Sequence, residues 1–196
     1  MLLLTDPCVR PGALAPDECA RLIRYFDAAP DTAAARLAGG VESDIRVCRA
    51  LWVDDEPETS WIFLRLAALV AKVNREIFHF DLDDFRENLQ ILRYDAAGEG
   101  GGEGEGDAAG RYDAHTDIGT SGHSTTRKLS LSIQLSEPEF YVGGDLRIDT
   151  GDGDWAAPRD AGTAILFPSF VRHSVAALAS GARYALVAWV HGPAFR

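Results

Sequence analysis

The second half of the chain is built from short runs in which apolar and polar residues alternate. From Phe85 onward this period of two replaces helical spacing, and turns such as Gly143-Gly144 and Ser180-Gly181 separate the runs. The expected strands cover approximately residues 87–95, 111–117, 128–136, 144–148, 163–167, 171–178 and 183–191. Many short strands with turns between them are typical of a sandwich or a barrel. The pattern therefore predicts a β-sheet core for this half.

The first half predicts helices that support this core. Residues 15–27 begin with proline and acids and continue with an apolar stripe at helical spacing, and a second helix is expected from near Pro57 to Phe78. Between them, residues 45–53 alternate and predict one strand. A chain of 196 residues is most simply one domain, with helical support over about 1–84 and the core over about 85–196. We expect a mainly β protein whose helices cover one sheet of a jelly roll.

Composition narrows the possible partners and compartment. A formal net charge of -11 argues against nucleic-acid partners, because binding to phosphates needs a basic surface. The opening segment has too short an apolar run for a signal peptide, and no stretch is long enough to span a membrane. The odd number of cysteines, without a CxxC pair, predicts free thiols in a reducing compartment: Cys8, Cys19 and Cys48. We expect a cytoplasmic protein, and the sequence does not predict its oligomeric state.

His115, Asp117 and His173 form a candidate metal site. In a strand, residues i and i+2 point to the same face, so His115 and Asp117 can approach one ion together. His173, in a short apolar segment after a turn, can supply the third ligand. Two imidazoles and one carboxylate are the ligands of a non-haem Fe(II) centre that keeps open coordination positions. The alternative without a metal is that His115 and Asp117 form a hydrogen-bonded pair at a strand end and that His173 is a histidine of the core.

Two later strands carry polar groups that bear on a ligand cavity. Arg183 begins an otherwise apolar strand and shares a face with Trp189, and its planar fork suits a carboxylate. The short connection at residues 179–181 predicts that the His173 and Arg183 strands are antiparallel neighbours. In the strand at 128–136, Ser132 and Gln134 face either solvent or a cavity, and the sequence leaves both possibilities open.

Taken together, these segments resemble the Fe(II)- and 2-oxoglutarate-dependent dioxygenases, most closely the prolyl 4-hydroxylase-like branch. The matching segments, in family order, are 92–94, 111–117, 143–146, 162–168, 173–175 and 181–189. They span about half of the chain. The resemblance implies a double-stranded β-helix, also called a cupin-like jelly roll, with His115, Asp117 and His173 on iron.

The resemblance also implies a cosubstrate site. Arg183 would bind the distal carboxylate of 2-oxoglutarate, with Tyr94 nearby. Gln134 stands where several relatives carry a tyrosine, so its role departs from the family pattern. Ser132 and Trp189 would line the same pocket.

The implied activity uses Fe(II), 2-oxoglutarate and O2 to hydroxylate an unactivated C–H bond, with release of succinate and CO2. The substrate would be an amino acid, another small metabolite or a peptide residue. Two alternatives are a noncatalytic jelly-roll protein that binds metal or a small molecule, and a cupin-type isomerase or hydrolase. The glycine- and glutamate-rich loop at 98–110 is expected to be flexible and is either a lid or an inert insertion.

Overall fold

Two antiparallel β-sheets and two α-helices make up the described part of the chain. The structure, a computed structural model, describes residues 5–29, 33–34, 45–98 and 108–195. The expectation of a mainly β protein with N-terminal helices is confirmed. The loop predicted at 98–110 lies mostly outside the described residues. None of the described helices has the length and apolar character needed to cross a membrane.

Both predicted helices form, with ends close to those expected. Helix α1 spans Pro16–Ala28, and the Glu18 carboxylate accepts a hydrogen bond of 2.8 Å from the Ala15 N–H, which satisfies one free donor at its start. Helix α2 spans Ser60–Val73 and continues as one π-helical turn, η1, at Asn74–Phe78. His79 ends this turn with a φ of 55°, in the left-handed region.

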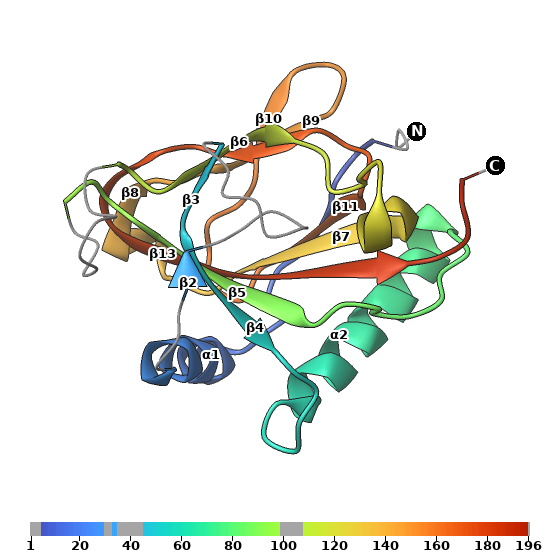
Figure 1. Cartoon of the computed structure of the whole chain (residues 1–196), viewed down its shortest axis with the longest axis horizontal. Helices are drawn as coiled ribbons and strands as arrows, with labels where there is room; N and C mark the ends of the chain where they lie inside the picture. Colours follow the sequence, from blue (N-terminus) through green and yellow to red (C-terminus); the bar gives the residue numbers. More distant parts are fainter. Residues whose placement is uncertain (1–4, 30–32, 35–44, 99–107, 196) are drawn as a thin grey trace.

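The larger sheet carries both helices on one face and a cavity on the other. In spatial order its strands are β1 (Cys8–Arg10), β11 (Ala164–Pro168), β7 (Arg127–Gln134), β13 (Leu178–His191), β5 (Leu89–Asp95), β4 (Arg49–Val53) and β2 (Ala33–Ala34), and β8 (Tyr141–Gly143) also pairs with β13. Figure 1 shows α1 and α2 together beneath this sheet.

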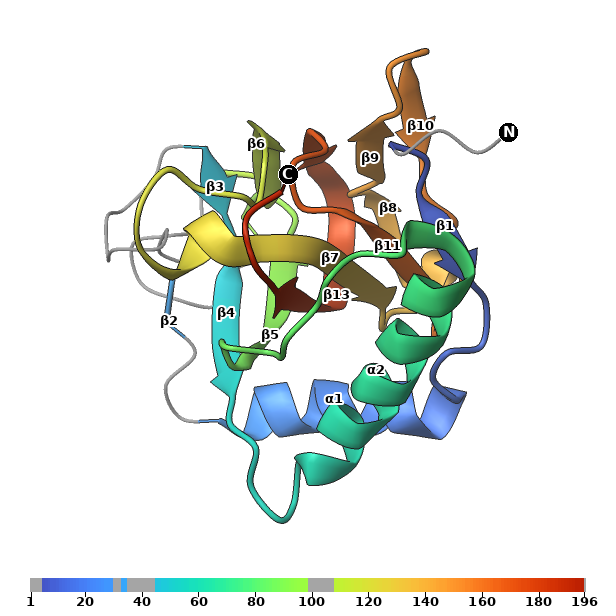
Figure 2. The same ribbon diagram turned by 90° about the vertical axis from the view of Figure 1, so that its right-hand side faces the viewer.

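The smaller sheet lies on the other side of the larger one (Figure 2). Its strands, in spatial order, are β10 (Asp154–Ala156), β9 (Leu146–Asp149), β12 (His173–Val175), β6 (Arg111–His115) and β3 (Arg46–Val47). Two short 3-10 turns, η2 (Gly122–Thr126) and η3 (Pro138–Phe140), precede β7 and β8. Strands β9 and β10 are joined by a hairpin turn.

Two hydrophobic clusters, one on each face of the larger sheet, hold these layers together. The first joins the helices to the sheet and includes Phe26 of α1, Leu66 of α2 and Leu186 of β13. The second lies between the two sheets and includes Ile148 and Phe167. Alternation along each strand of the larger sheet therefore sends one set of side chains towards the helices and the other towards the smaller sheet.

Two expectations about strands were wrong. The single strand predicted at 45–53 divides at Cys48, and β3 pairs with β6 in the smaller sheet whereas β4 pairs with β5 in the larger sheet. The predicted connection at 179–181 is part of β13, whose first residues pair with β8. Strand β12 pairs with β6 and β9, so the His173 and Arg183 strands are not neighbours but belong to different sheets.

Candidate metal centre

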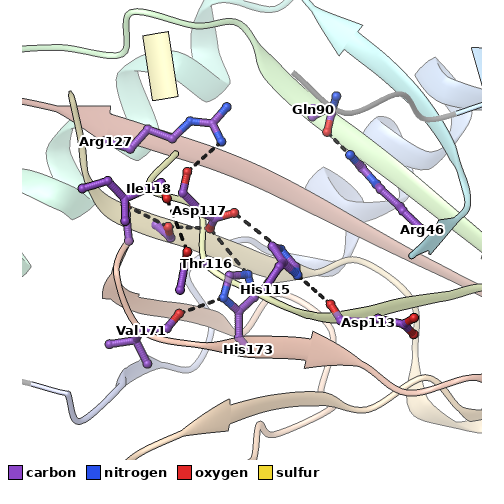
Figure 3. Close-up of polar contacts among 12 residues, drawn as sticks. Arg46, Gln90, Asp113, His115, Thr116, Asp117, Ile118, Arg127, Val171 and His173 are labelled. Atoms are coloured by element: carbon purple, nitrogen blue, oxygen red, sulfur yellow. Dashed lines mark hydrogen bonds and ion pairs between the residues drawn. The ribbon is translucent and has the colours of Figure 1, made fainter. Parts of the chain in front are cut away.

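His115, Asp117 and His173 come together at the open end of the smaller sheet (Figure 3). Their ligand atoms lie within 4.8 Å of one another. The His115 Nε2 is 3.6 Å from Asp117 Oδ1, and the His173 Nε2 is 3.5 Å from Asp117 Oδ2. Strand β6 ends at His115, so Asp117 reaches the group from the following turn and not from the strand that was predicted to extend to it.

Backbone carbonyls orient both imidazoles in the same way. The His115 Nδ1 lies 2.8 Å from the Asp113 carbonyl oxygen, and the His173 Nδ1 lies 3.1 Å from the Val171 carbonyl oxygen. A carbonyl oxygen only accepts, so each Nδ1 carries the proton and each Nε2 keeps its lone pair. This is the tautomer in which both Nε2 atoms can bind a metal ion.

Burial favours the neutral form of His173, and ring contacts hold both imidazoles in place. His173 is buried, and burial lowers its pKa even though the Asp117 charge opposes that effect. The ring centroids of Tyr112 and His115 are 3.5 Å apart in a stacked arrangement, and Phe167 meets His173 edge-on at 4.7 Å. The two rings therefore have little freedom to turn away.

Asp117 is anchored from both its backbone and its side chain. The N–H groups of Asp117 and Ile118 donate to the Ser169 carbonyl oxygen, both at 2.9 Å. Ser130 Oγ donates to Asp117 Oδ2 at 2.6 Å and lies 3.0 Å from Ser169 Oγ. Burial alone would raise the pKa of Asp117, but the nearby His173 and His115 and these hydrogen bonds outweigh it and hold the pKa well below its usual value.

A cavity of about 630 Å³ opens beside this cluster, between the two sheets. Its walls are mixed, with three arginines, two carboxylates and two tryptophans among aliphatic residues. The residues that line the cavity include Arg46, Trp52, Glu87, Gln90, Tyr94, Asp117, Arg127, Ser130, Ser132, Arg183 and Trp189. Every predicted site residue except Gln134 lines this cavity.

Arg183 is the most deeply buried charged group of the cavity. Its side chain is 1% exposed, and Nη2 donates to Gln134 Oε1 at 2.8 Å. Among the described residues, its Nε and Nη1 have no hydrogen-bond partner. Tyr94, which is paired with it across β5 and β13, presents its ring 5.5 Å from the guanidinium carbon. Two buried, unpartnered donors on one charged group favour a bound anion.

The side chains of Ser132 and Gln134 on β7 face the interior of the protein and not solvent. Ser132 lines the cavity, and Gln134 is buried with its amide between Arg183 and the Pro158 carbonyl oxygen. Trp189 also faces the cavity, on the same face of β13 as Arg183. Asp113 and Arg172, whose neighbours are metal-ligand candidates, are exposed and do not line the cavity.

Sequence reasoning missed a buried polar network beside the site. Arg127 donates from Nε to Glu87 at 2.7 Å, and its guanidinium carbon lies 3.8 Å above the Trp189 ring. His191 is fully buried and lies 3.0 Å from the same Glu87 carboxylate. The sequence offered two signals of this network: charged residues at the start of the Arg127 strand, and a histidine in an apolar strand. Only the fold shows that these residues meet.

The comparisons with known proteins identify the family. The model of the 2OG-Fe(II) oxygenase superfamily matches residues 89–191. The chain belongs to this superfamily. The matched segment begins at β5 and ends with β13, and it includes all three metal-ligand candidates and Arg183. The predicted enzyme class and its cofactors Fe(II), 2-oxoglutarate and O2 are those of this superfamily.

Individual relatives agree with the prolyl 4-hydroxylase-like branch. A PKHD-type hydroxylase of Synechococcus sp. is 39% identical over 82 residues, which are 40% of this chain and 37% of that protein. The chain thus matches little more than a third of its curated relative's length. A Pseudomonas putida prolyl-4-hydroxylase structure has a TM-score of 0.72 at 21% identity, covering 96% of this chain and 94% of that one.

A prolyl hydroxylase of Trichoplax adhaerens, solved with a hypoxia inducible factor peptide fragment, has a TM-score of 0.75 at 16% identity. The match covers 95% of this chain and 83% of the Trichoplax adhaerens chain. At such low identity these structures establish a shared fold. The oxygenase fold therefore extends beyond the matched segment into the N-terminal helices.

Proposed function

We propose that the chain is a single-domain Fe(II)- and 2-oxoglutarate-dependent hydroxylase whose two sheets form a double-stranded β-helix. His115, Asp117 and His173 would hold the iron. The donor set fits this metal, because one carboxylate and two imidazoles with free Nε2 atoms are the ligands of the 2-His-1-carboxylate sites. The distances between ligand atoms are close to those that one ion with bonds of about 2.1 Å requires.

Arg183 would bind the distal carboxylate of 2-oxoglutarate. Its unpartnered Nε and Nη1 are free to donate to an anion, and Gln134 fixes the third nitrogen so that the guanidinium keeps its orientation. Tyr94 and Ser132 line the same region, and Trp189 closes the wall. The observation that carries the proposal is that the triad and this unsatisfied guanidinium share one cavity.

The bound iron, with 2-oxoglutarate and O2, would supply the oxidising power to place a hydroxyl group on an unactivated C–H bond, with release of succinate and CO2. The chain's own contribution is geometric. The partly buried triad and the Trp189 wall restrict water, and the cavity fixes which C–H bond faces the metal. We propose an amino acid, a small metabolite or a peptide residue as substrate, no nucleic-acid or membrane partner, and a cytoplasmic location.

Consumption of 2-oxoglutarate by the reconstituted protein tests the proposal. Asp117→Ala should abolish Fe(II) binding and O2-dependent succinate formation, because it removes the only carboxylate of the triad. Arg183→Gln should retain Fe(II) but raise the 2-oxoglutarate concentration for half-saturation about 100-fold, the cost of losing a buried charged partner. The matched controls are Asp154→Ala and Arg147→Gln, at exposed positions of the smaller sheet.

Undiminished succinate formation by Asp117→Ala would contradict the iron site. A wild-type protein that binds Fe(II) without any O2-dependent consumption of 2-oxoglutarate would instead support the noncatalytic alternative.

A further inference from the structure

Arg46 places another guanidinium in the cavity, from a strand outside the segment that the family model matches. Its Nη2 donates to Gln90 Oε1 at 3.0 Å, as Figure 3 shows, and its Nε lies 3.2 Å from Cys48 Sγ. Its guanidinium carbon is 5.0 Å from the centre of the Tyr112 ring, which stacks on His115. The Tyr112 ring therefore contacts both Arg46 and His115, which is a metal-ligand candidate.

The charges of the cavity are unequally matched. Its two carboxylates are Asp117, which faces the two imidazoles, and Glu87, which is paired with Arg127. Within the described ranges, no ion pair joins Arg46 to a carboxylate. Only neutral groups, an amide oxygen, a thiol and a phenol ring, surround it there. Partial burial of a guanidinium without an anion is unfavourable, so this position favours an anionic ligand.

Arg46 and Arg183 serve different parts of the cavity. On β5, Tyr94 is paired with Arg183, whereas Gln90, the partner of Arg46, is paired with Val187. These two backbone positions are four residues apart along the strand, about 13 Å, although both guanidinium charges also act on the Tyr94 hydroxyl. A cosubstrate bound to Arg183 therefore leaves the Gln90 end of the cavity, where an amide oxygen holds the Arg46 guanidinium, for another molecule.

The surroundings of Arg46 also include an apolar wall. Trp52 pairs with Gln90 across β4 and β5, lines the cavity and is 47% exposed. Its ring centre lies 6.3 Å from that of Trp189, which stands on β13 of the same sheet. A cation fixed by an amide, in a cavity that two indoles also line, is suited to a carboxylate attached to an apolar body.

We propose that Arg46 binds a carboxylate of the substrate and that Trp52 and Trp189 contact the substrate's apolar part. The substrate class is then a small carboxylic acid, of which a free amino acid is the simplest case. This inference rests on the proposed function, because it names the substrate of that site. Arg46 would determine specificity without taking part in metal or 2-oxoglutarate binding.

Paired ligands test this inference by binding. The probes are the twenty common free L-amino acids and their carboxamides, measured by ligand-observed NMR on anaerobic protein loaded with Fe(II) and 2-oxoglutarate. For at least one pair, wild-type protein should bind the acid about 10- to 100-fold more tightly than the amide, the range expected for a charge-assisted contact. Arg46→Gln should reduce this ratio to near one, and Arg46→Lys should keep part of it.

Arg49→Gln is the matched control. Arg49 begins the next strand, and its guanidinium points to the helix side, 6.0 Å from the Phe26 ring and 3.5 Å from Asp95. It removes the same charge without touching the cavity, so the preference for the acid should persist. Dipeptides with free and amidated C-termini form a second arm. A preference for the acid that is confined to dipeptides would still support Arg46 as the carboxylate site, with a peptide terminus as its source.

Two binding results would overturn the inference: no acid is preferred to its amide by wild-type protein, or Arg46→Gln retains the preference. A rise in the 2-oxoglutarate half-saturation of Arg46→Gln as large as that of Arg183→Gln would also overturn it, because Arg46 would then belong to the cosubstrate site. Succinate formation without added substrate, measured on the same samples, separately tests the proposed function. The binding ratio decides the inference whatever that turnover is.

Discussion

At the scale of single residues, the hydrogen bonds to Asp117 would fix its carboxylate at the proposed metal site before any ion binds. Ser130 Oγ donates to Asp117 Oδ2, so the proton of the Ser130–Ser169 contact comes from Ser169. This chain of two hydroxyls fixes one carboxylate oxygen and leaves Oδ1 towards His115. Such support of a ligand by neighbouring groups typically contributes 10- to 100-fold to metal affinity.

We therefore expect Ser130→Ala to weaken Fe(II) binding about 10-fold without abolishing it, since all three ligands remain. Titration with Co(II), followed by its visible absorption, measures this affinity in air. Ser132→Ala, at the next cavity-facing serine of β7, is the matched control and should leave metal affinity unchanged. Equal affinities of wild type and Ser130→Ala would show that the hydroxyl does not support the ligand.

The types and spacing of residues along the chain were enough to predict the metal-ligand candidates and the cavity arginine of β13. His115, Asp117, His173 and Arg183 could be named from sequence because their types and order are distinctive. Arg46 and Ser130 could not be assigned a role from the sequence. A charged residue in an alternating strand is usually exposed, and a strand face that carries serines fits either solvent or a cavity. Their roles depend on which sheet the strand joins.

At the scale of elements, the Gly143-Gly144 turn before β9 determines the space available to Arg183. Gly144 has a φ of +68°, and a Cβ there would lie 2.4 Å from Leu178 Cδ1 and 3.2 Å from Arg183 Cδ. Only glycine adopts this backbone conformation readily and also leaves room for the arginine stem. The turn is therefore part of the proposed carboxylate site although it contributes no donor.

Gly144→Ala should raise the 2-oxoglutarate half-saturation as well as lower stability, because the new methyl group displaces Leu178 and Arg183. Gly151→Ala is a fitting comparison, since Gly151 has a φ of +86° with open space around it. It should cost only the backbone strain, about 1 kcal/mol, and leave 2-oxoglutarate binding intact. Isothermal titration and thermal unfolding separate the two effects. The same binding constant in both variants would show that the methyl group is accommodated.

Periodicity predicted most elements but not how they join. The alternation at 45–53 is continuous, yet β3 and β4 enter different sheets because each pairs with a partner from elsewhere in the chain. Likewise, Gly181 resembles a turn residue, but its φ of +75° is accommodated within β13, close to the backbone of Phe140. Pairing between distant strands is not encoded in local spacing.

At the scale of the whole molecule, Glu87 links three segments behind the Trp189 wall. It accepts hydrogen bonds from Arg127 at the start of β7 and from His191 at the end of β13. Burial alone would raise its pKa, but these hydrogen bonds and the Arg127 charge lower it from 4.5 to about 2. The lower pKa in the folded state means that ionised Glu87 stabilises the protein above about pH 4.5, and that this contribution is lost as the pH falls towards 2.

Glu87→Gln should therefore destabilise the protein at pH 7 by about 2 kcal/mol, a value reduced from the full shift because the carboxylate keeps some contact with solvent. The difference from wild type should persist down to about pH 5 and narrow as the pH falls further. Urea unfolding at pH 7, 5, 4 and 3 measures it. Exposed Glu139→Gln provides the comparison for loss of one charge. A difference that does not change with pH would contradict this account.

The aiming of both imidazoles by main-chain oxygen atoms has a consequence for how the molecule tolerates change. The carbonyls of Asp113 and Val171 exist whatever side chain the residue carries. A substitution at exposed Asp113 would therefore be limited only by its effect on β6, and a library built at this codon should yield many variants with an intact metal site, whereas Val171 is buried between the sheets and tolerates fewer replacements. The rim beside the centre is thus open to redesign.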